Sequence, residues 1–140
     1  MNIRIFVGDW NALKKDAQFL RTDVFIIEQG VPRFLEWDED DQFSLHAVAY
    51  DEKDKPVATG RLLPNGYIGR MAVKKNARKK GIGSKILKTL IDRAIANEYK
   101  EIFINAQKQT IPFYIKHKFT TIGNDFIEAS MPHILMYLKL

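Results

Sequence analysis

The chain has 140 residues, which is enough for one domain, and its 46% hydrophobic and 28% charged residues are typical of a globular protein. It contains no cysteine, which excludes disulfides, thiolate metal ligands and a cysteine nucleophile, and its three histidines show no metal-ligand spacing. No run reaches the ~20 apolar residues of a membrane span, and the first ten residues lack the apolar segment of a signal peptide. We therefore expect a single cytoplasmic domain over residues 1–140, without a metal and without a membrane.

The net charge of +5 is unevenly distributed along the chain. Eight basic residues and no acidic residue lie between Arg70 and Lys88, whereas residues 36–41 read EWDEDD. A nucleic-acid-binding face usually spreads basic and aromatic side chains over a wide area. A cluster confined to one loop favours a compact polyanion such as a nucleotide cofactor over nucleic acid, with a nucleic-acid-binding module as the alternative.

The first half of the chain predicts a strand, a helix and an antiparallel pair of strands. Residues 2–7, NIRIFV, are expected to form the strand. Asp9 is a suitable N-cap, and apolar residues at three- and four-residue steps then predict one helix that ends near Gly30. The acidic segment that follows is either a wall of a substrate site or a solvated loop over a sheet edge. Strands are expected at residues 44–50 and 56–63, joined by the polar turn DEKDK.

Residues 67–95 combine a strand, a basic glycine-containing loop and a helix. Branched and aromatic residues predict the strand at 67–73, and apolar residues at helical spacing predict the helix at 82–95. Between them the chain reads Arg78-Lys79-Lys80-Gly81-Ile82-Gly83. The start of a helix offers unpaired N–H groups at the positive end of its dipole, and glycines let a phosphate approach the backbone closely. The loop is predicted to bind phosphate, and a plain basic helix start is the alternative.

The remaining residues predict a strand at 101–106, a short helix at 110–118 and a final strand pair at 119–122 and 133–140. A helix connects the strand at 67–73 to the strand at 101–106, so these two strands should be parallel. The segment GNDFIEASMP between the last two strands is expected to be a loop. The order β-α-(α)-β-β-β-α-β-α-β-β predicts an α/β (α+β) fold with a mixed central sheet. Because the last strand is apolar on both faces, a homodimer through the C-terminal strands is expected.

The basic loop resembles the [QR]-x-x-G-x-[GA] pyrophosphate loop of the GNAT (GCN5-related) N-acetyltransferases, and the order of elements is also that of the family. The segments VFIIEQGVP, EWDEDD, ATGRLLPNGYIGRMAV, INAQKQTIPFY and EASMPH resemble its small, single-domain, ElaA-like bacterial branch. The resemblance implies the GNAT acyl-CoA N-acyltransferase fold. It also implies transfer of an acetyl group from acetyl-CoA to a primary amine of a small molecule, by direct attack in a ternary complex.

The resemblance also implies the site residues. Tyr114 would protonate the departing CoA thiolate, a role that a phenol of pKa about 10 can perform, with a core tyrosine as the alternative. Lys118 departs from the branch, which has glycine there, so either backbone strain or a different helix end is expected, and the orientation of Tyr114 depends on which of them occurs. The implied cofactor-binding residues are Met71, Ala72, Val73, Arg78, Lys79, Lys80, Gly81, Ile82, Gly83, Ser84, Asn105 and Phe113.

The sequence does not identify the general base. Some members of the family use a glutamate on the central strand, but residues 67–73 contain no carboxylate. The candidates for base or substrate binding are Glu28, Glu36, Trp37, Asp38 and His133, with His46 as a weaker histidine. The acidic segment would favour a cationic acceptor. The alternative functions are acetylation of protein N-termini or lysines, and a CoA-binding module without catalysis.

Overall fold

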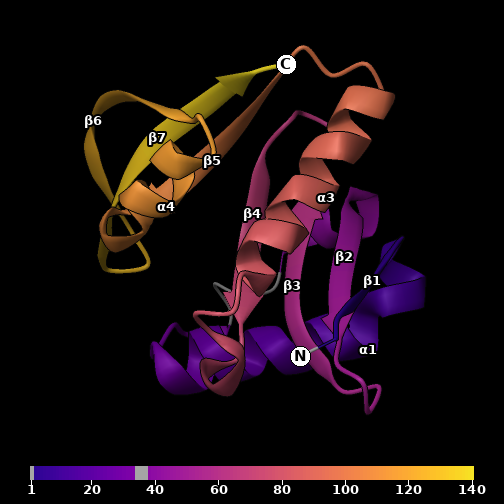
Figure 1. Cartoon of the computed structure of the whole chain (residues 1–140). Coiled ribbons are helices and arrows are strands. Elements are labelled where there is room, and N and C mark those ends of the chain that lie inside the picture. The colour runs from indigo at the N-terminus through magenta and orange to yellow at the C-terminus, as the bar shows by residue number, and fades with distance from the viewer. Residues whose placement is uncertain (1, 34–37) are drawn as a thin grey trace.

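Figure 1 shows the computed structural model of the chain, which describes residues 2–33 and 38–140. The described strands form a four-stranded antiparallel sheet of order β1-β2-β3-β4 and a three-stranded antiparallel sheet of order β5-β7-β6. The α/β fold class and the predicted order of elements are confirmed. The elements are β1 Arg4–Gly8, α1 Trp10–Arg21, η1 Thr22–Glu28, η2 Glu39–Phe43, β2 Leu45–Tyr50, β3 Pro56–Leu62, β4 Ile68–Val73, η3 Lys75–Ala77, α3 Ile82–Ala96, β5 Glu101–Gln107, η4 Lys108–Thr110, α4 Ile111–Lys116, β6 Thr120–Glu128 and β7 Met131–Lys139.

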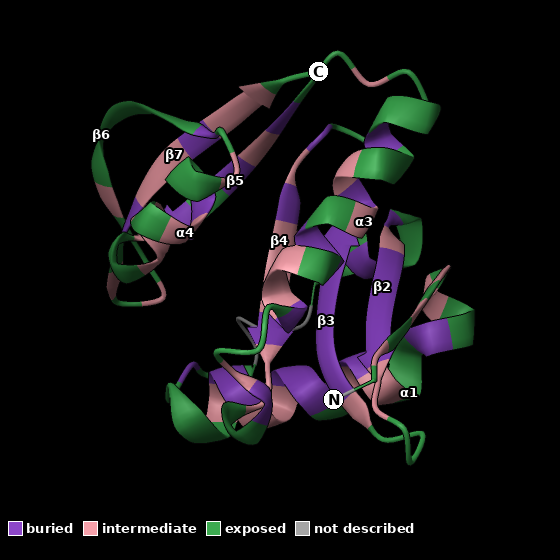
Figure 2. Cartoon of the chain, in the orientation of Figure 1, coloured by how far each residue is buried: buried purple, intermediate pink, exposed green. Residues whose placement is uncertain are grey.

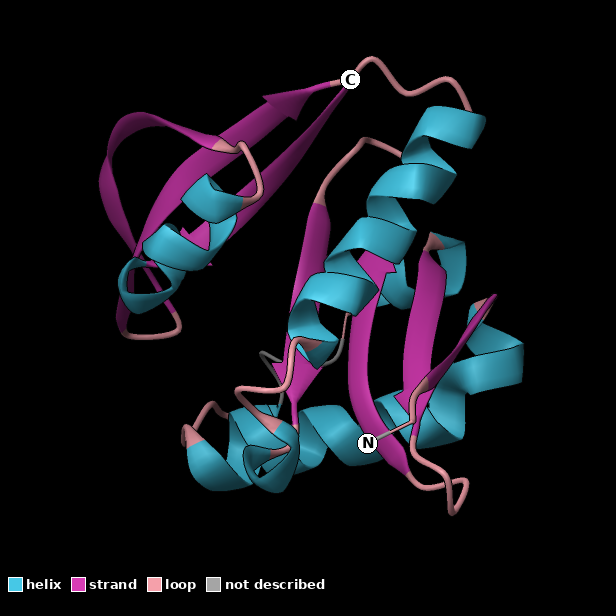
Figure 3. Cartoon of the chain, viewed as in Figure 1, coloured by secondary structure: helices cyan, strands magenta, loops and turns pink. Residues whose placement is uncertain are grey.

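Helices α1 and α3 cover opposite faces of the four-stranded sheet (Figure 3). Side chains alternate along a strand, so Val48 of β2 packs with Leu13, Ala17 and Leu20 of α1, whereas its neighbours join the core under α3. The apolar stripe of α3 supplies fully buried side chains to that core, which also takes in residues of β5, β7 and α4. Figure 2 shows the resulting buried layer on β2, β3 and the inner side of α3.

The first helix changes its winding partway along. Asp9 caps α1 as predicted, since its carboxylate accepts the N–H of Ala12 at 2.9 Å. The predicted helix end near Gly30 is confirmed, since helical winding continues to Glu28 with Gln29 as its C-cap, but residues 22–28 form a π-helix in place of the expected α-helix. The apolar spacing could not reveal the wider turn, since Val24 and Phe25 stay buried in it. Such π-helical turns occur frequently at functional sites, and this one brings Phe25 to a cleft described below.

A single parallel bridge between Tyr67 and Phe103 joins the two sheets, and the Phe103 N–H donates to the Gly66 carbonyl at 3.0 Å. The predicted parallel direction is therefore confirmed at this point. Gly66 is required here: its φ is 94°, and a Cβ would lie 3.0 Å from the carbonyl oxygen of Glu101. Within the described residues no further β4–β5 pair follows the bridge, so the two strands diverge (Figure 1).

The C-terminal segment is a long hairpin, which confirms the predicted final strand pair but corrects the long loop expected between its strands. The residues expected to form a loop, 123–132, belong largely to β6 and β7. Gly123 and its polar neighbours mark a break in the ladder register between Ile122 and Phe126, and the chain reverses at Ala129 and Ser130, whose φ angles are 50° and 63°. Positive φ at both central residues is the geometry of a tight hairpin turn. Strand β7 lies between β5 and β6, which accounts for its apolar character on both faces.

Lys118 occupies the position where the related branch has glycine, and it takes up glycine's conformation. Its φ is 75°. The N–H of Phe119 donates to the Tyr114 carbonyl at 3.1 Å and that of Lys118 to the Ile115 carbonyl at 2.9 Å, which is a Schellman helix end. The expected choice between strain and a different helix end is thus resolved: the helix end is the usual one, and lysine adopts a left-handed conformation. None of the described helices is long and apolar enough to cross a membrane.

Candidate active site

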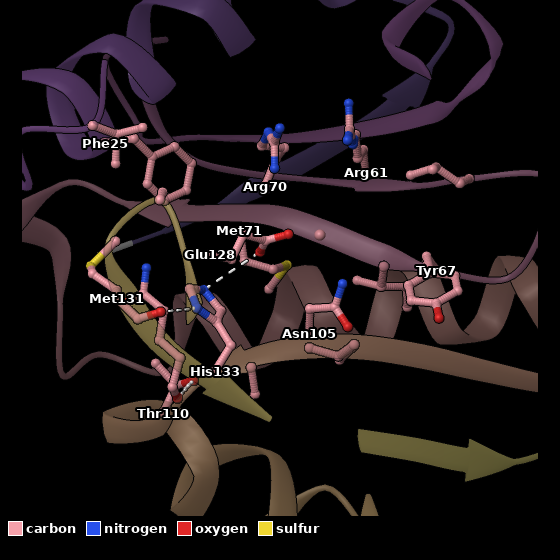
Figure 4. A pocket seen from close by; sticks show the side chains of 18 of the residues that line it. Phe25, Arg61, Tyr67, Arg70, Met71, Asn105, Thr110, Glu128, Met131 and His133 are labelled. Atoms are coloured by element: carbon pink, nitrogen blue, oxygen red, sulfur yellow. Dashed lines mark hydrogen bonds and ion pairs between the residues drawn. The ribbon is translucent and has the colours of Figure 1, made fainter. Parts of the chain in front are cut away.

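The divergence of β4 and β5 opens a cleft of about 570 Å³, which is the size of a small-molecule site (Figure 4). Strand β3 pairs with one edge of β4 and β7 pairs with one edge of β5. The opposite edges face each other across the cleft, and their backbone groups have no strand partner among the described residues beyond the bridge. Such edges can hydrogen-bond an extended ligand in the manner of an added strand. Met71, whose backbone was predicted to bind the cofactor, lines this cleft; Ala72 and Val73 continue the same strand.

A bulge in β4 shapes this wall. The β3–β4 register shifts between Thr59 and Arg61, so β4 carries one extra residue there, and Arg70 has a φ of 48°. Gly60 lies opposite the bulge, and a Cβ on it would come within 2.6 Å of the Met71 sulfur. The absence of a side chain at position 60 thus leaves room for Met71, which helps the bulge to form.

Tyr114 lies on α4 with its side chain buried and lines the cleft. Its ring packs edge-on against Phe113 and Phe119. No hydrogen bond to its hydroxyl occurs in the described part of the chain, although buried tyrosine hydroxyls usually have a partner. Burial raises the pKa of Tyr114 to about 12, so the group is protonated at neutral pH.

Asn105 lies on β5, on the opposite wall of the cleft from Met71. Its side chain is exposed and projects from β5 toward the cleft (Figure 4). The neighbours Ile104 and Ala106 point into the core, as strand alternation requires. An amide group is therefore available beside the unpaired edge of the strand, where the sequence predicted a contact with the cofactor.

A second hollow, of about 400 Å³, lies at the start of α3. Lys79 and Gly81 have positive φ angles of 62° and 76°, and the first intrahelical bond runs from Lys85 N–H to the Gly81 carbonyl. The N–H groups of the first helical turn, Ile82–Ser84, thus have no acceptor within the helix. A Cβ at Gly83 would lie 3.7–3.9 Å from ring carbons of Phe113, which is ordinary contact, so the ring lies beside the start of α3 without requiring glycine there.

The basic residues of the loop differ in what they contact. Lys79 lines the hollow, joined by Lys116 of α4, which the sequence reasoning did not select. The Lys80 ammonium lies 3.3 Å from the Asn76 carbonyl, and the Arg78 side chain turns toward η1. Oγ of Ser84, which lines the hollow, lies 2.9 Å from Nε2 of His117, so a titratable ring contacts a residue of the hollow. Burial and the nearby Lys116 and Lys88 lower the pKa of His117.

Glu28 forms a bidentate ion pair with Arg78, at 2.6 and 2.7 Å, across 50 positions of the chain. The Nε of Arg78 also donates to the Val73 carbonyl at 2.9 Å, so the pair joins η1 to the end of β4. The hydrogen bond from Arg78 lowers the pKa of Glu28, which makes this carboxylate a weaker proton acceptor. Glu28 is therefore poorly suited to the base role for which it was a candidate, because Arg78 already binds its carboxylate.

The acidic segment is tied to three arginines. Asp38 accepts two bonds from Arg61, at 2.7 and 2.9 Å, and one from Arg70 at 3.1 Å. Although partial burial opposes ionisation, these guanidinium groups hold the pKa of Asp38 below its usual range. Asp41 is buried and accepts from Arg21 at 2.8 and 3.1 Å and from Arg61 at 2.8 Å. Sequence reasoning missed this network because each partner lies 20 or more positions away, with no local signal.

The histidines named as base candidates have different surroundings. His46 is buried under Trp10 and its Nε2 lies 2.8 Å from the Asp41 carbonyl, outside the cleft. His133 lines the cleft from β7, with Nδ1 at 2.8 Å from the Met131 carbonyl and Nε2 at 3.6 Å from Glu128 (Figure 4). Sequence reasoning did not select Glu128, because it assigned this segment to a loop. Glu36 and Trp37, the remaining candidates, lie outside the described residues.

Known proteins share this architecture. The family model described as "Acetyltransferase (GNAT) domain" matches residues 16–140. A Bacillus subtilis (strain 168) relative named "Uncharacterized N-acetyltransferase YjcF" is 39% identical over 126 residues, covering 87% of this chain and 89% of the relative. In structure, an acyl-CoA N-acyltransferase from Pseudomonas aeruginosa has a TM-score of 0.86 at 24% identity, and Escherichia coli ElaA has 0.87 at 22%. Each structural match covers 97% of this chain and 99% of the other. The chain therefore belongs to the GNAT acetyltransferase family.

Proposed function

We propose that this acetyltransferase moves an acetyl group from acetyl-CoA to a primary amine of a small molecule, by direct attack in a ternary complex. The observation that carries the proposal is the hydroxyl of Tyr114, a buried side chain on the wall of a cleft between two diverging strand edges; this hydroxyl has no partner among the described residues. A donor in that position can serve a leaving group that develops negative charge. The cleft volume of about 570 Å³ suits a small acceptor.

The residues present fit acetyl-CoA as the donor substrate. The hollow at the start of α3 offers free backbone N–H groups and the ammonium groups of Lys79 and Lys116, which together suit a diphosphate. The edges of β4 and β5 offer donors and acceptors for the amides of a pantetheine arm, and Asn105 adds a side-chain amide. Phe113 borders the hollow, where its ring can pack against the arm. Arg78 would contribute by fixing the loop to η1.

The reaction needs a neutral amine beside the thioester carbonyl carbon. The C–N bond forms as the C–S bond breaks, and the electron pair of the C–S bond goes to sulfur. Tyr114 donates its proton to that sulfur. Because a phenol of pKa about 12 is a weaker acid than a thiol, this transfer should be coupled to the arrival of a proton from the acylated amine at the phenol oxygen. The hydroxyl then ends the cycle protonated, as it began.

The proposal is tested by release of free thiol from acetyl-CoA over a panel of amines, with Tyr114→Phe beside the wild type. We expect kcat to fall about 10²–10⁴-fold, the usual scale for a general acid, with KM for acetyl-CoA nearly unchanged. Tyr137→Phe on β7, which lines neither cavity, is the control. Near-wild-type kcat in Tyr114→Phe, when chemistry limits the rate, would remove the role. Acetylation of peptides but not of small amines would favour a protein acceptor instead.

A further inference from the structure

We infer that His133 and Glu128 form the pair that removes the proton from the acceptor ammonium: His133 takes it at Nε2, and Glu128 stabilises the imidazolium that results. The inference rests on the proposed acetyl transfer and supplies the base that the sequence left open. Its basis is the hydrogen bonding of the ring, the position of the carboxylate beside it and the pairing of the other nearby carboxylates.

The ring of His133 is held in one orientation and one tautomer. Its Nδ1 lies 2.8 Å from the Met131 carbonyl, which can only accept a hydrogen bond, so Nδ1 carries the hydrogen. In the neutral ring Nε2 therefore presents a lone pair. The side chain of His133 is 6% exposed and stacks on Phe126. His133 lies on β7, which is paired with a strand on each side. A carbonyl-anchored imidazole with a free Nε2 is the arrangement that a general base requires.

Glu128 provides a charge next to that nitrogen. The hairpin register places Glu128 of β6 opposite Met131 of β7, and its Oε2 lies 3.6 Å from His133 Nε2. The carboxylate is 52% exposed and lines the same cleft. A negative group at this distance favours the protonated ring, and the separation is longer than a hydrogen bond, so Nε2 is not already occupied.

Most other carboxylates near the cleft have partners. Glu28 is bound to Arg78, and Asp38 is bound to Arg61 and Arg70. Asp40 also lines the cleft, but no imidazole of the described residues forms an ion pair with it. The hairpin pair instead lies on the same cleft as the Tyr114 hydroxyl, so acid and base serve one cavity. The charged and titratable groups of the cleft lining are Asp38, Asp40, Arg61, Tyr67, Arg70, Tyr114, Glu128 and His133.

The protons balance in this scheme. The acceptor enters as an ammonium, and one N–H bond breaks as the Nε2–H bond of His133 forms. The free lone pair of the amine forms the C–N bond while the C–S electron pair leaves with sulfur. A second amine proton passes to the Tyr114 oxygen as the Tyr114 proton passes to sulfur. The amide keeps the third proton, and His133 returns its proton to solvent.

The first arm of the test is the pH dependence of kcat/KM for the acceptor. We expect His133→Gln to lower kcat/KM about 10²-fold or more near neutral pH, with activity recovering as pH rises and the amine loses its proton unaided. Glu128→Gln should also lower kcat/KM for the acceptor near neutral pH, by a smaller factor. Asp125→Asn, which removes a carboxylate of the same strand that pairs with Lys108, is the control. KM for acetyl-CoA and thermal stability should stay near wild-type values in all three variants.

The second arm does not need turnover. With three histidines in the chain, nitrogen NMR can follow each ring. We expect the neutral His133 ring to carry its hydrogen on Nδ1, and its Nε2 resonance to shift in Glu128→Gln but not in Asp125→Asn. An unchanged Nε2 resonance, or a neutral ring protonated on Nε2, would overturn the pair. So would an active His133→Gln enzyme with the wild-type pH profile. Absence of thiol release with every amine would count against the proposed function, and the NMR result would still decide the pair.

Discussion

Replacing Asp41 with asparagine should destabilise the protein severely, because this buried carboxylate accepts hydrogen bonds from two guanidinium groups inside the fold, those of Arg21 and Arg61. The side chains of Asp41 and Arg21 are 4% and 1% exposed, and Arg61 is 6% exposed. All three bonds from these arginines to Asp41 are 2.8–3.1 Å long. The substitution Asp41→Asn would keep the shape but remove the charge, and the NH₂ group of an asparagine cannot accept from a guanidinium.

Removing one charged member of a buried ion-pair network costs about 3–5 kcal/mol, out of a total stability of about 5–15 kcal/mol for a typical domain. An unfolding entropy of about 2.1 cal/mol/K per residue over 140 residues gives about 0.3 kcal/mol/K. The Tm should therefore fall by about 10–17 °C. Arg61 increases the penalty, since its Nε is already buried without a partner in the described part of the chain.

Thermal unfolding followed by circular dichroism at pH 7 measures this shift, and urea unfolding gives the free energy independently. Asp92→Asn is the matched control, since Asp92 is an exposed residue of α3. It should change Tm by no more than about 2 °C, as expected of a surface substitution. If Asp41→Asn behaves like Asp92→Asn, the two arginines do not depend on Asp41, and the reasoning fails.

Three further predictions concern the cofactor site and the assembly. Gly81→Asp should lower CoA affinity by more than about 10²-fold, because it puts a carboxylate where we propose that phosphate binds. The neutral Gly81→Asn variant should bind CoA far more tightly than Gly81→Asp. Equal CoA affinities of the two variants by calorimetry would argue against the loop as the phosphate site. Bound phosphate should raise the lowered pKa of His117, so CoA binding takes up a proton and weakens as pH rises through the pKa of the bound state; His117→Gln should flatten this component, and an identical pH dependence in both proteins would contradict it. We also propose a homodimer through the edge strand β6, where Ile122 and Ile127 are 48% and 71% exposed; a monomer mass by light scattering at about 100 μM would rule it out.

The sequence predicted the elements whose pattern is local. The helix at 82–95 and the strands at 56–63 and 101–106 agree with α3, β3 and β5 to within two residues at each end, because periodic apolar residues and turn residues specify them. The π-helical winding of residues 22–28, and the extension of the predicted final strand pair through residues 123–132, were missed for the opposite reason. A π-helical turn buries the same residues as an α-helical turn would, so the apolar spacing does not distinguish them. Gly123 is a residue type typical of turns, but it lies within β6, at a break in the register of that strand.

The site was predicted unevenly for the same physical reason. A phosphate loop is a contiguous stretch, so its glycines and lysines could be selected by position alone. The ion pairs Glu28–Arg78 and Asp41–Arg21 join residues 50 and 20 positions apart, and only the fold brings them together. Glu128 becomes a neighbour of His133 only through the register of the turn end of the hairpin, a part of the chain that was expected to be a loop.

Because arginines already bind several carboxylates of the acidic segment, other carboxylates should recognise a positively charged acceptor. The acidic segment suggested attraction of a cationic amine, but Asp38 and Asp41 are already paired with Arg21, Arg61 and Arg70. Of the carboxylates that line the cleft, Asp40 and Glu128 are then left to attract an ammonium group. Glu128 lies beside the nitrogen that we propose as the base, so one charge would both draw the ammonium toward His133 and stabilise the proton once it has moved. Glu128→Gln would then weaken both the attraction and the deprotonation of a cationic acceptor. With an acceptor analogue that is already neutral, the same substitution should leave the reaction nearly unchanged.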